Sequence, residues 1–289
     1  MHDMAIDTSL AAELRGLDAL DTPLERPAVA GRLWSQLWPK LAAIAIFVGM
    51  WQIVVWMGLK PRYVLPGPAT AFGEFAHQLT QSSFWHATGV TVTRGIIGFL
   101  IASVIGLALG VAVARFGVLR AAIGSLITGL QTMPSIAWFP LAILLFQLSE
   151  AAILFVILIG AVPSIANGVI SGVDYVPTTL VRAGRNIGAR GLALYRHVIL
   201  PAALPSIVSG LKQGWAFAWR SLLAGELIVA IANRPSLGAF LANSRELGEP
   251  SYMLALMIAI LLIGVIVDSA FSAADVRMRR RRGVGGLTS

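Results

Sequence analysis

The sequence predicts an all-α membrane protein, a polytopic bundle of six transmembrane helices with short helices on the cytoplasmic side. Of its 289 residues, 57% are hydrophobic and only 12% are charged, whereas a typical soluble domain is about 25% charged. The mean hydropathy is +0.78, and several apolar runs reach the roughly 20 residues that a helix needs to cross the hydrocarbon core of a bilayer. We therefore expect a multi-pass protein of the cell membrane, in contact with the lipid bilayer.

The first span is expected at about residues 41–59. As a helix this run would extend about 28 Å, and Trp38 and Trp56 flank it, as aromatic side chains do at membrane interfaces. The segment that follows, residues 60–88, contains the letters PGP and a short amphipathic stretch. It predicts an exposed interfacial segment and not a span.

The next two spans have features that constrain their packing. The second, about residues 89–114, carries Gly106 and Gly110, a spacing that lets another helix approach closely. The third, about residues 119–147, is interrupted at Pro134 and again six residues later, so we expect a kinked or broken helix. The remaining spans are expected at about residues 151–172, 204–232 and 253–271.

The basic residues set the orientation, because positively charged loops stay on the cytoplasmic side. With both termini cytoplasmic, most of the 22 Lys and Arg residues lie inside. Those left outside or within spans are Lys60, Arg62, Arg234 and Arg245, and Arg94, Lys212 and Arg220. The chain then divides into a cytoplasmic arm, a membrane domain and a basic cytoplasmic tail, at residues 1–38, 39–276 and 277–289. The arm mixes both signs of charge and lacks the apolar core of a signal peptide.

Composition and motifs exclude several kinds of chemistry. Cysteine is absent, so disulfides and thiolate metal sites are excluded. No nucleotide-binding GxxxxGK(S/T), metalloprotease HExxH or serine-hydrolase GxSxG motif occurs, and the four histidines are scattered. We therefore expect no enzyme activity, and no metal, cofactor or nucleic acid bound by this chain. Cytoplasmic basic residues explain the formal net charge of +8.

A polar, basic stretch separates the fourth span from the fifth. It predicts a helix at about residues 178–187, a break at 188–191 and a second helix at 192–199. The second helix should end before Pro201, because proline cannot continue a regular helix without a kink. By topology the stretch is cytoplasmic, so it would form a rigid projection that another protein can grip. The plainer alternative is a basic loop whose charge only fixes the topology.

Residues of this stretch resemble the cytoplasmic signature of ABC importer permeases, Glu-Ala-Ala-xxx-Gly, nine residues, then Ile-x-Leu-Pro. Gly188 and Leu200-Pro201 match, and Val198 stands in place of the isoleucine. Arg182 stands where the family usually has glutamate, and Gly184 where it has the second alanine. Two stretches of the sequence are most similar to the branch of this family that imports aliphatic sulfonates, taurine, nitrate, bicarbonate and pyrimidine precursors. They are NIGARGLALYRHVILPAALPSIVSGLKQG and, after the first span, LPGPATAF. The resemblance covers most of the chain.

The resemblance implies partners and residue roles. In that family two permease subunits pair, each grips a cytoplasmic ABC ATPase that uses ATP and Mg, and an extracytoplasmic substrate-binding protein docks outside. Gly188 would permit the turn between coupling helices, Ala183 would pack in the ATPase groove, and Leu200-Pro201 would anchor the return to the membrane. The residues thus expected to couple to the ATPase are Arg182, Ala183, Gly184, Arg185, Gly188, Ala189, Val198, Leu200 and Pro201.

Charged side chains within the fifth span form a second candidate site. Burying one charge at the bilayer centre costs roughly 2.5–3.5 kcal/mol, so such charges must face protein or a wet cavity. We expect Arg220, beside Gln213, to give positive potential to the route of an anionic substrate, with Glu226 orienting Arg220 or gating the outer end. Alternatively, Arg220 pairs with Glu226, Asp268 or a backbone carbonyl and only fixes packing. The residues expected along a translocation path are Gln213, Arg220, Glu226, Gln131 and Ser135, the last two beside the Pro134/Pro140 break. Arg94 is expected to be an interface anchor that snorkels.

The leading hypothesis is a permease subunit of an ABC importer that forms the path for a small anionic solute. A sulfonate such as taurine is the first choice, and the resemblance implies a homodimer. Nitrate, bicarbonate or a pyrimidine precursor as solute, and a homologous second permease as partner, stay open. A self-contained secondary transporter or channel would need a second inverted half, and an intramembrane enzyme would need a catalytic pair in its spans. The sequence supports neither.

Overall fold

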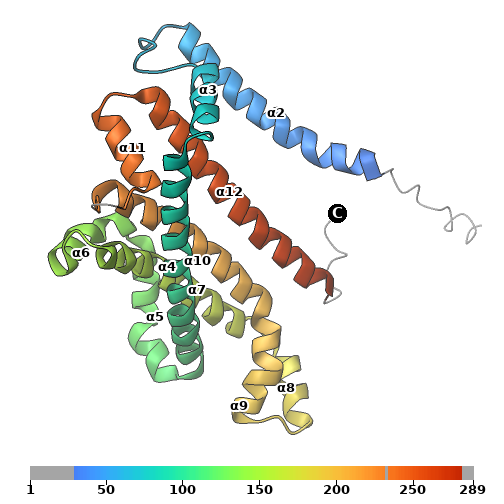
Figure 1. Ribbon diagram of the computed structural model, residues 1–289. Coiled ribbons are helices and arrows are strands. Elements are labelled where there is room, and N and C mark those ends of the chain that lie inside the picture. The colour runs from blue at the N-terminus through green and yellow to red at the C-terminus, as the bar shows by residue number, and fades with distance from the viewer. Residues whose placement is uncertain (1–28, 232–233, 282–289) are drawn as a thin grey trace, which may run out of the picture. The chain divides into compact units, whose positions relative to one another are not determined.

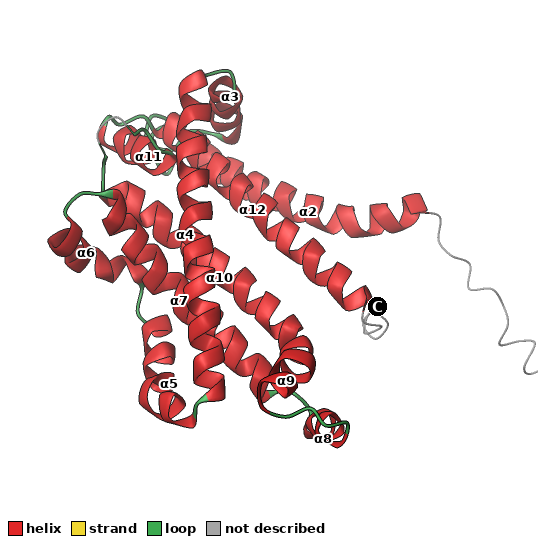
Figure 2. Cartoon of the chain, turned by 60° about the horizontal axis from the view of Figure 1, so that its bottom comes forward, coloured by secondary structure: helices red, strands yellow, loops and turns green. Residues whose placement is uncertain are grey.

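The computed structural model describes residues 29–231 and 234–281, which form helices and loops and, within those ranges, no β-strand (Figures 1 and 2). The predicted all-α class is confirmed. The chain divides into two units, Met1–Leu59 and Lys60–Ser289, and each has its own helices.

The first unit contributes one membrane-length helix, α2 (Val29–Trp56), which begins inside the expected arm. Its apolar part, Leu37–Trp56, is long enough to cross a bilayer and covers most of the expected first span. The helix ends just before Gly58, whose φ is +66°, a conformation that glycine adopts without steric cost. The first part of the expected arm, residues 1–28, lies outside the described residues, as does most of the basic tail, residues 282–289.

The second unit alternates long spans with short surface helices. In chain order its elements are α3 (Pro68–Gln78), α4 (Ser82–Arg115), α5 (Gly117–Thr132), η1 (Ser135–Trp138), α6 (Phe139–Phe146), α7 (Glu150–Asp174), α8 (Thr178–Asn186), α9 (Gly191–Leu194), η2 (Tyr195–Ile199), α10 (Leu200–Ile228), α11 (Leu237–Glu246) and α12 (Pro250–Arg281). Helix α3 packs on α12, and α11 packs on α10 and α12. Both short helices lie at the end of this unit opposite α8 and α9 (Figure 1).

The spans agree with the prediction, with the third one broken. Four helical stretches of the second unit are long and apolar enough to cross a bilayer: α4, α7, the stretch from α9 through α10, and α12. With α2 they make five spans in the described part of the chain, and six if α5 and the η1–α6 pair, bent by 105°, count as one. The break falls at Pro134, as predicted. Pro140 lies in the first turn of α6, where a helix does not need its N–H.

Helix α7 is the centre of the second unit, because it packs along both α4 and α10 (Figure 2). Its residues 151–163 are apolar on all sides, as expected of a helix enclosed by protein. Its side chains fill the main core together with residues of α4, α6 and α10. The fully buried core residues that α7 supplies are Ala152, Ile153, Val156, Ile157, Ala161 and Ile165.

Glycines make the close approach of these helices possible. A Cβ on Gly106 or Gly110 of α4 would stand 2.8 or 2.7 Å from a side-chain atom of α7, so the predicted close contact at this pair is confirmed. Helices α7 and α10 are closer still, because a Cβ on Gly168 would stand 2.5 Å from the Cα of Gly210. Backbone meets backbone at this crossing, and any side chain would push the two helices apart.

Replacing Gly168 with alanine should therefore separate α7 from α10. Alanine is intrinsically better than glycine in a helix by about 1 kcal/mol, so a loss of stability would come from the crossing. We expect Gly168→Ala to destabilise the protein by about 1–3 kcal/mol, as overpacking does, measured as a lower melting temperature in detergent. The matched control is Gly129→Ala, because a Cβ there meets no atom within 4 Å. Equal melting temperatures for the two variants would contradict the close crossing.

Candidate functional site

The coupling segment, residues 178–200, forms the helix–break–helix that the sequence predicts. Gly188 has a φ of +90° and Gly191 a φ of +51°, so both ends of the break use the left-handed conformation that favours glycine. The N–H of Ala189 donates to the carbonyl of Gly184 at 3.0 Å, a bond that closes the end of α8 after a glycine of this conformation.

The two helical parts of the coupling segment, α8 and the stretch of α9 and η2, pack together at Gly184, which is buried. A Cβ there would stand 2.9 Å from Val198 Cγ2 and 3.0 Å from Leu194 Cδ1. Gly184 is one of the departures from the family signature. Its lack of a side chain lets α8 lie directly against α9 and η2.

The return of the chain into the membrane differs from the expectation in one respect. The helix does not end before Pro201; η2 is a π-helical turn that leads without interruption into α10. The N–H of Leu200 donates to the carbonyl of Tyr195, five residues back. Pro201 cannot donate to His197 four residues back, and the wider π turn accommodates that loss without ending the helix. The coupling segment is therefore joined to α10 by continuous helix.

The projecting face of the coupling segment is exposed. Arg182, Ala183 and Arg185 are exposed on α8. The break between α8 and α9 exposes two apolar side chains, Ile187 at 85% and Leu192 at 82%. Exposed apolar side chains that lie together are typical of surfaces that contact another protein, so this face is a candidate docking site.

A polar groove of about 430 Å³ lies between α7 and α10, in the part of these helices next to the coupling segment. Its hydrogen-bonding side chains are all neutral: Asn167, Ser171, Ser206, Ser209 and Gln213. The Gly168–Gly210 crossing is part of its lining. Gln213, predicted to lie along a path, is exposed in this groove.

Two polar residues predicted beside the break of the third span take different places. Gln131 accepts a hydrogen bond from Asn167 Nδ2 at 3.1 Å, so it lies beside the polar groove. Ser135 accepts a hydrogen bond from the hydroxyl of Ser221 at 2.8 Å, and Ser221 is fully buried. Ser135 therefore ties η1 to α10 at a distance from the groove lining.

Arg220 and Glu226, both predicted along the path, do not lie together. They are six residues apart on α10, so their side chains point about 120° apart around the helix. The exposed Arg220 donates from Nε to the backbone carbonyl one turn earlier at 3.1 Å and packs over the Phe217 ring, 4.8 Å from its centroid. Asp268, the other expected partner, pairs instead with Lys212 at 3.1 Å. The pairing with Glu226 or Asp268 is thus wrong, and the alternative of a backbone carbonyl is what the structure shows.

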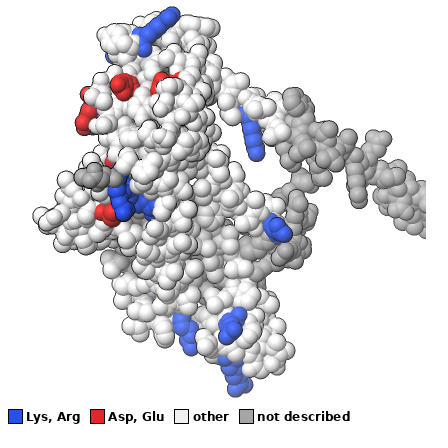
Figure 3. All heavy atoms as spheres, viewed as in Figure 1, with Lys and Arg blue, Asp and Glu red and all other residues white. Residues whose placement is uncertain are grey.

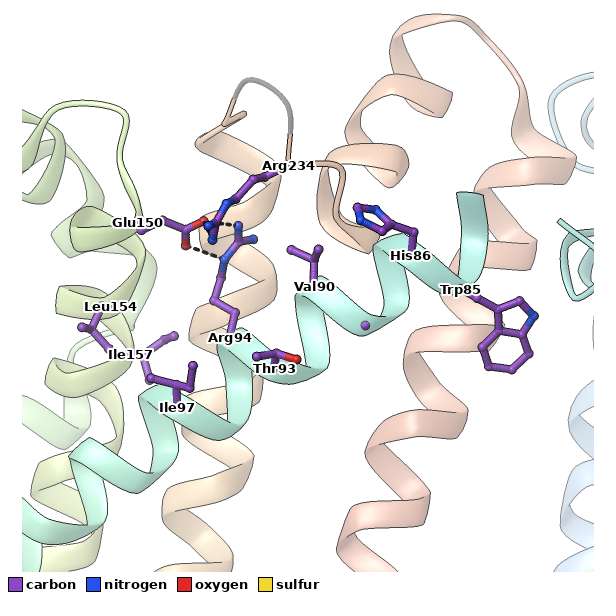
Figure 4. Close-up of a pocket in the computed structure, with 11 residues that line it drawn as sticks. Trp85, His86, Val90, Thr93, Arg94, Ile97, Glu150, Leu154, Ile157 and Arg234 are labelled. Atoms are coloured by element: carbon purple, nitrogen blue, oxygen red, sulfur yellow. Dashed lines mark hydrogen bonds and ion pairs between the residues drawn. The ribbon is translucent and has the colours of Figure 1, made fainter. Parts of the chain in front are cut away.

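Glu226 belongs to a hydrogen-bonded group of polar and charged residues that the sequence pattern did not predict, here termed the Arg94 cluster (Arg94, Glu150, Glu226 and Thr91). Arg94 of α4 forms an ion pair with Glu226, whose side chain is fully buried. Its guanidinium also donates two bonds to Glu150 at the beginning of α7, at 2.6 and 2.7 Å. Figure 4 shows Arg94 and Arg234 both directed at Glu150. Arg94 is therefore a partner of two carboxylates and not the snorkelling anchor that we expected.

The Arg94 cluster also holds the beginning of α11. Thr91 Oγ1 donates to Glu226 Oε2 at 2.9 Å and accepts from the N–H of Leu237 at 2.9 Å. The N–H of Gly238 donates to the same carboxylate oxygen at 3.1 Å, which places a negative charge where a helix N-terminus favours it. Helices α4, α7, α10 and α11 therefore meet in one hydrogen-bonded network.

The sequence indicates that the charges of this cluster need partners, but it does not indicate which residues pair. Arg94 and Glu226 are charges within spans, and such charges need partners. The two residues are 132 positions apart, however, and their pairing depends on how α4 and α10 cross.

A cavity of about 700 Å³ beside the cluster is lined by Trp85, His86 and Thr93 among others (Figure 4). In residues 29–231 and 234–281 no three His, Asp or Glu side chains are grouped to bind a metal ion.

Comparisons with known proteins place this arrangement among transport proteins. Residues 81–280 match the family model described as "Binding-protein-dependent transport system inner membrane component". A putative ABC transporter permease protein of Methanocaldococcus jannaschii is 31% identical over 233 residues, which cover 79% of this chain and 86% of that protein.

Relatives named for different solutes are equally similar to this chain. The bicarbonate transport system permease protein of Synechococcus elongatus is 29% identical, over 79% of this chain and 84% of its own length. A putative aliphatic sulfonates transport permease protein of Escherichia coli is also 29% identical, over 76% and 83%. Among solved structures, a chain of the MetNI methionine ABC transporter in an inward-facing conformation has the same fold, with a TM-score of 0.57 at 22% identity over 69% of this chain and 95% of that chain.

Neutralising Glu226 should destabilise the end of the bundle that carries α11. Removing one partner of a buried ion pair costs about 3–5 kcal/mol, because the other charge stays buried; Arg94 keeps Glu150, so we expect Glu226→Gln to fall at the lower end of this range. The measurement is thermal unfolding in detergent. Glu246→Gln, an exposed acid of α11, is the control. A Glu226→Gln protein that melts with the wild type would show that the Arg94 cluster does not hold the fold.

A side chain at Gly184 should displace α8 from η2. Gly184→Ala forces Val198 and Leu194 to move, and such overpacking costs about 1–3 kcal/mol. We expect the backbone amides of α8 to exchange hydrogen faster in this variant, and we expect the double variant Gly184→Ala/Val198→Ala to recover slow exchange. Unchanged exchange in Gly184→Ala would mean that the glycine is not needed for this contact.

Proposed function

The chain belongs to the binding-protein-dependent transport system inner membrane components and is a permease subunit of an ABC transporter; on this premise we propose that, with a second copy of itself, it forms the import path for a small anionic solute. A separate ATPase subunit binds the coupling segment and hydrolyses ATP with Mg, and an extracytoplasmic binding protein delivers the solute. This chain does not itself hydrolyse ATP. The observation that carries the proposal is the polar face that α7 and α10, two helices long and apolar enough to cross a bilayer, present at their crossing.

The polar groove does not suit a lipid environment. Polar groups in hydrocarbon cost several kcal/mol each unless they are paired, and the groove opens five hydrogen-bonding side chains on the surface of two spans. Such a face is stable only against water or another protein chain. A second copy that packs across α10 would enclose the groove and leave a wet path between the two subunits.

Arg220 supports an anionic solute. Of the three basic residues in the expected spans, Arg94 and Lys212 each pair with a carboxylate, whereas Arg220 pairs with no carboxylate of the described residues. It follows Gln213 by seven residues on α10, so the two side chains lie within about 20° of each other around the helix. An exposed guanidinium on the face of the groove residue Gln213 would attract anions to the path.

A sulfonate such as taurine is the first solute of this proposal, supported by the relative named for aliphatic sulfonates. The equally similar relative named for bicarbonate supports a second anion that the same face would admit. Nitrate would use Arg220 in the same way. An uncharged pyrimidine precursor would not need that charge, so the charge at this position separates the two kinds of solute.

The distribution of charge supports a cytoplasmic coupling segment. Figure 3 shows Lys and Arg side chains at the end of the second unit that carries α8 and α9. The basic residues at this end are Arg115, Arg120, Arg182, Arg185, Arg190 and Arg196. Because positively charged loops stay inside, this end faces the cytoplasm. With the bent pair counted as one span there are six spans, and an even number puts both chain termini in the cytoplasm too.

Removing the charge of Arg220 should slow uptake without disturbing the assembly. In proteoliposomes that contain the ATPase and are supplied with the binding protein, we expect Arg220→Gln to lower taurine uptake by about tenfold, which corresponds to about 1.4 kcal/mol. ATPase binding should be unchanged. Arg277→Gln, an exposed charge of α12, is the matched control.

Two outcomes of this assay would count against the proposal. Normal uptake by an intact Arg220→Gln assembly would remove Arg220 from the path. Uptake by the wild-type chain in the absence of ATPase and ATP would contradict the importer mechanism as a whole, because a permease of this kind depends on its ATPase.

A further inference from the structure

The coupling segment is strongly basic and contains no acidic residue. Arg182, Arg185, Arg190 and Arg196 are all exposed, and no Asp or Glu occurs in residues 175–225. None of the four forms an ion pair with a carboxylate of the described residues. Four positive charges therefore project from this surface without a counter-charge from the part of the chain that the structure describes.

The nearest acidic residue in the sequence does not neutralise them. Asp174, at the end of α7, pairs with Arg120 of α5 at 2.7 Å. This pair ties the two helices together beside the coupling segment. The charges of the coupling segment itself stay unbalanced.

The internal packing of the coupling segment decides which side of α8 faces outward. Gly184 lies against Val198, so the opposite side of the helix carries Thr179, Arg182 and Asn186. All three are exposed. Arg182 therefore stands on the outward face of α8, and Ala183, the alanine assigned to the ATPase groove, follows it in the sequence.

The position of this face favours a protein partner over lipid headgroups. Figure 1 shows α8 and α9 beyond the ends of α4 and α5, so the segment stands away from the spans. Ile187 and Leu192 are more than four-fifths exposed at its tip. Basic side chains beside exposed apolar ones, held on a helix pair, fit a groove that offers carboxylates to the arginines and apolar side chains to Ile187 and Leu192.

We infer that the cognate ATPase presents an acidic groove to the coupling segment, with at least one carboxylate paired with Arg182, and that this pairing restricts the permease to that ATPase. The inference rests on the proposed function, in which the coupling segment binds an ATPase. It adds the charge of the partner surface. That surface is acidic to suit Arg182, whereas a glutamate at position 182 would need a basic one.

Charge repulsion supplies the selectivity. A groove whose basic residues suit a glutamate would meet Arg182 with like charge, and juxtaposed like charges suppress wrong pairing. Arg185 lies one helical turn further along α8 and adds to the same repulsion. A correct groove gains a charge-assisted pair at the centre of the contact, where water is excluded.

The test uses the full chain in detergent with its own ATPase, and with the ATPase of a relative that carries glutamate at the matching position. Salt shortens the Debye length from about 10 Å at 0.1 M to about 3 Å at 1 M, so binding is measured at both concentrations. We expect the wild type to bind its own ATPase about tenfold more weakly at 1 M. We expect Arg182→Glu to weaken this binding by about tenfold and to improve binding to the other ATPase.

The controls separate a contact effect from misfolding and from lipid binding. Arg245→Glu makes the same change of charge on an exposed residue of α11, at the end opposite the coupling segment, and should leave ATPase binding unchanged. Arg182→Gln, which is less disruptive, should show a smaller loss in the same direction if Arg182→Glu does not fold. Nanodiscs of anionic phosphatidylglycerol and of neutral phosphatidylcholine test whether the arginines act through lipid.

Each outcome bears on the inference. Binding that ignores salt and both changes at Arg182 would overturn it, as would a loss that appears only in anionic nanodiscs. A switch of preference towards the other ATPase supports it. Restored binding also supports it when the Arg182→Glu permease is combined with a cognate ATPase in which an acidic groove residue is changed to lysine. If the wild type binds no ATPase at 0.1 M salt, the proposed function itself fails.

Discussion

The crossing of α7 and α10 at Gly168 and Gly210 sets the position of every other part of the candidate site. Because no side chain separates the two backbones there, the polar side chains beside the crossing line an open groove on its surface. From this point α10 runs in two directions, towards the coupling segment through η2 and towards Glu226 at its other end. One helix therefore connects the groove to both ends of the second unit.

The two ends of α10 are held in different ways. At Glu226, buried charges and hydrogen bonds join α10 to α4, α7 and α11, and buried networks of this kind resist separation because each broken bond leaves a buried polar group unpaired. At the other end, α10 continues into a helix pair held by the contact of Gly184 with Val198 and otherwise largely exposed. A force on the coupling segment thus acts on a helix whose far end is firmly tied.

Two departures from the permease signature, Gly184 and Arg182, differ in where their counterpart lies. Gly184 is balanced within the chain, because the side chains of Val198 and Leu194 occupy the space that an alanine would need. Arg182 has no such counterpart in the described residues, since it is exposed and no carboxylate of its own chain pairs with it. A change that packs inward is compensated inward, whereas a charge that points outward is available to a partner outside the chain.

Local properties of the sequence determined the fold class, the order of the spans, the broken third span and the helix–break–helix of the coupling segment. Hydropathy, glycine and proline act over a few residues, so their effects at Pro134, Gly188 and Gly191 could be predicted without knowledge of the rest of the chain. Only the tertiary structure decided that Glu226 pairs with Arg94 and not with Arg220, and that helix continues through Pro201 by a π turn. These features depend on how helices far apart in the sequence cross and on how a turn widens under packing, and neither can be deduced from the spacing of residues along one helix.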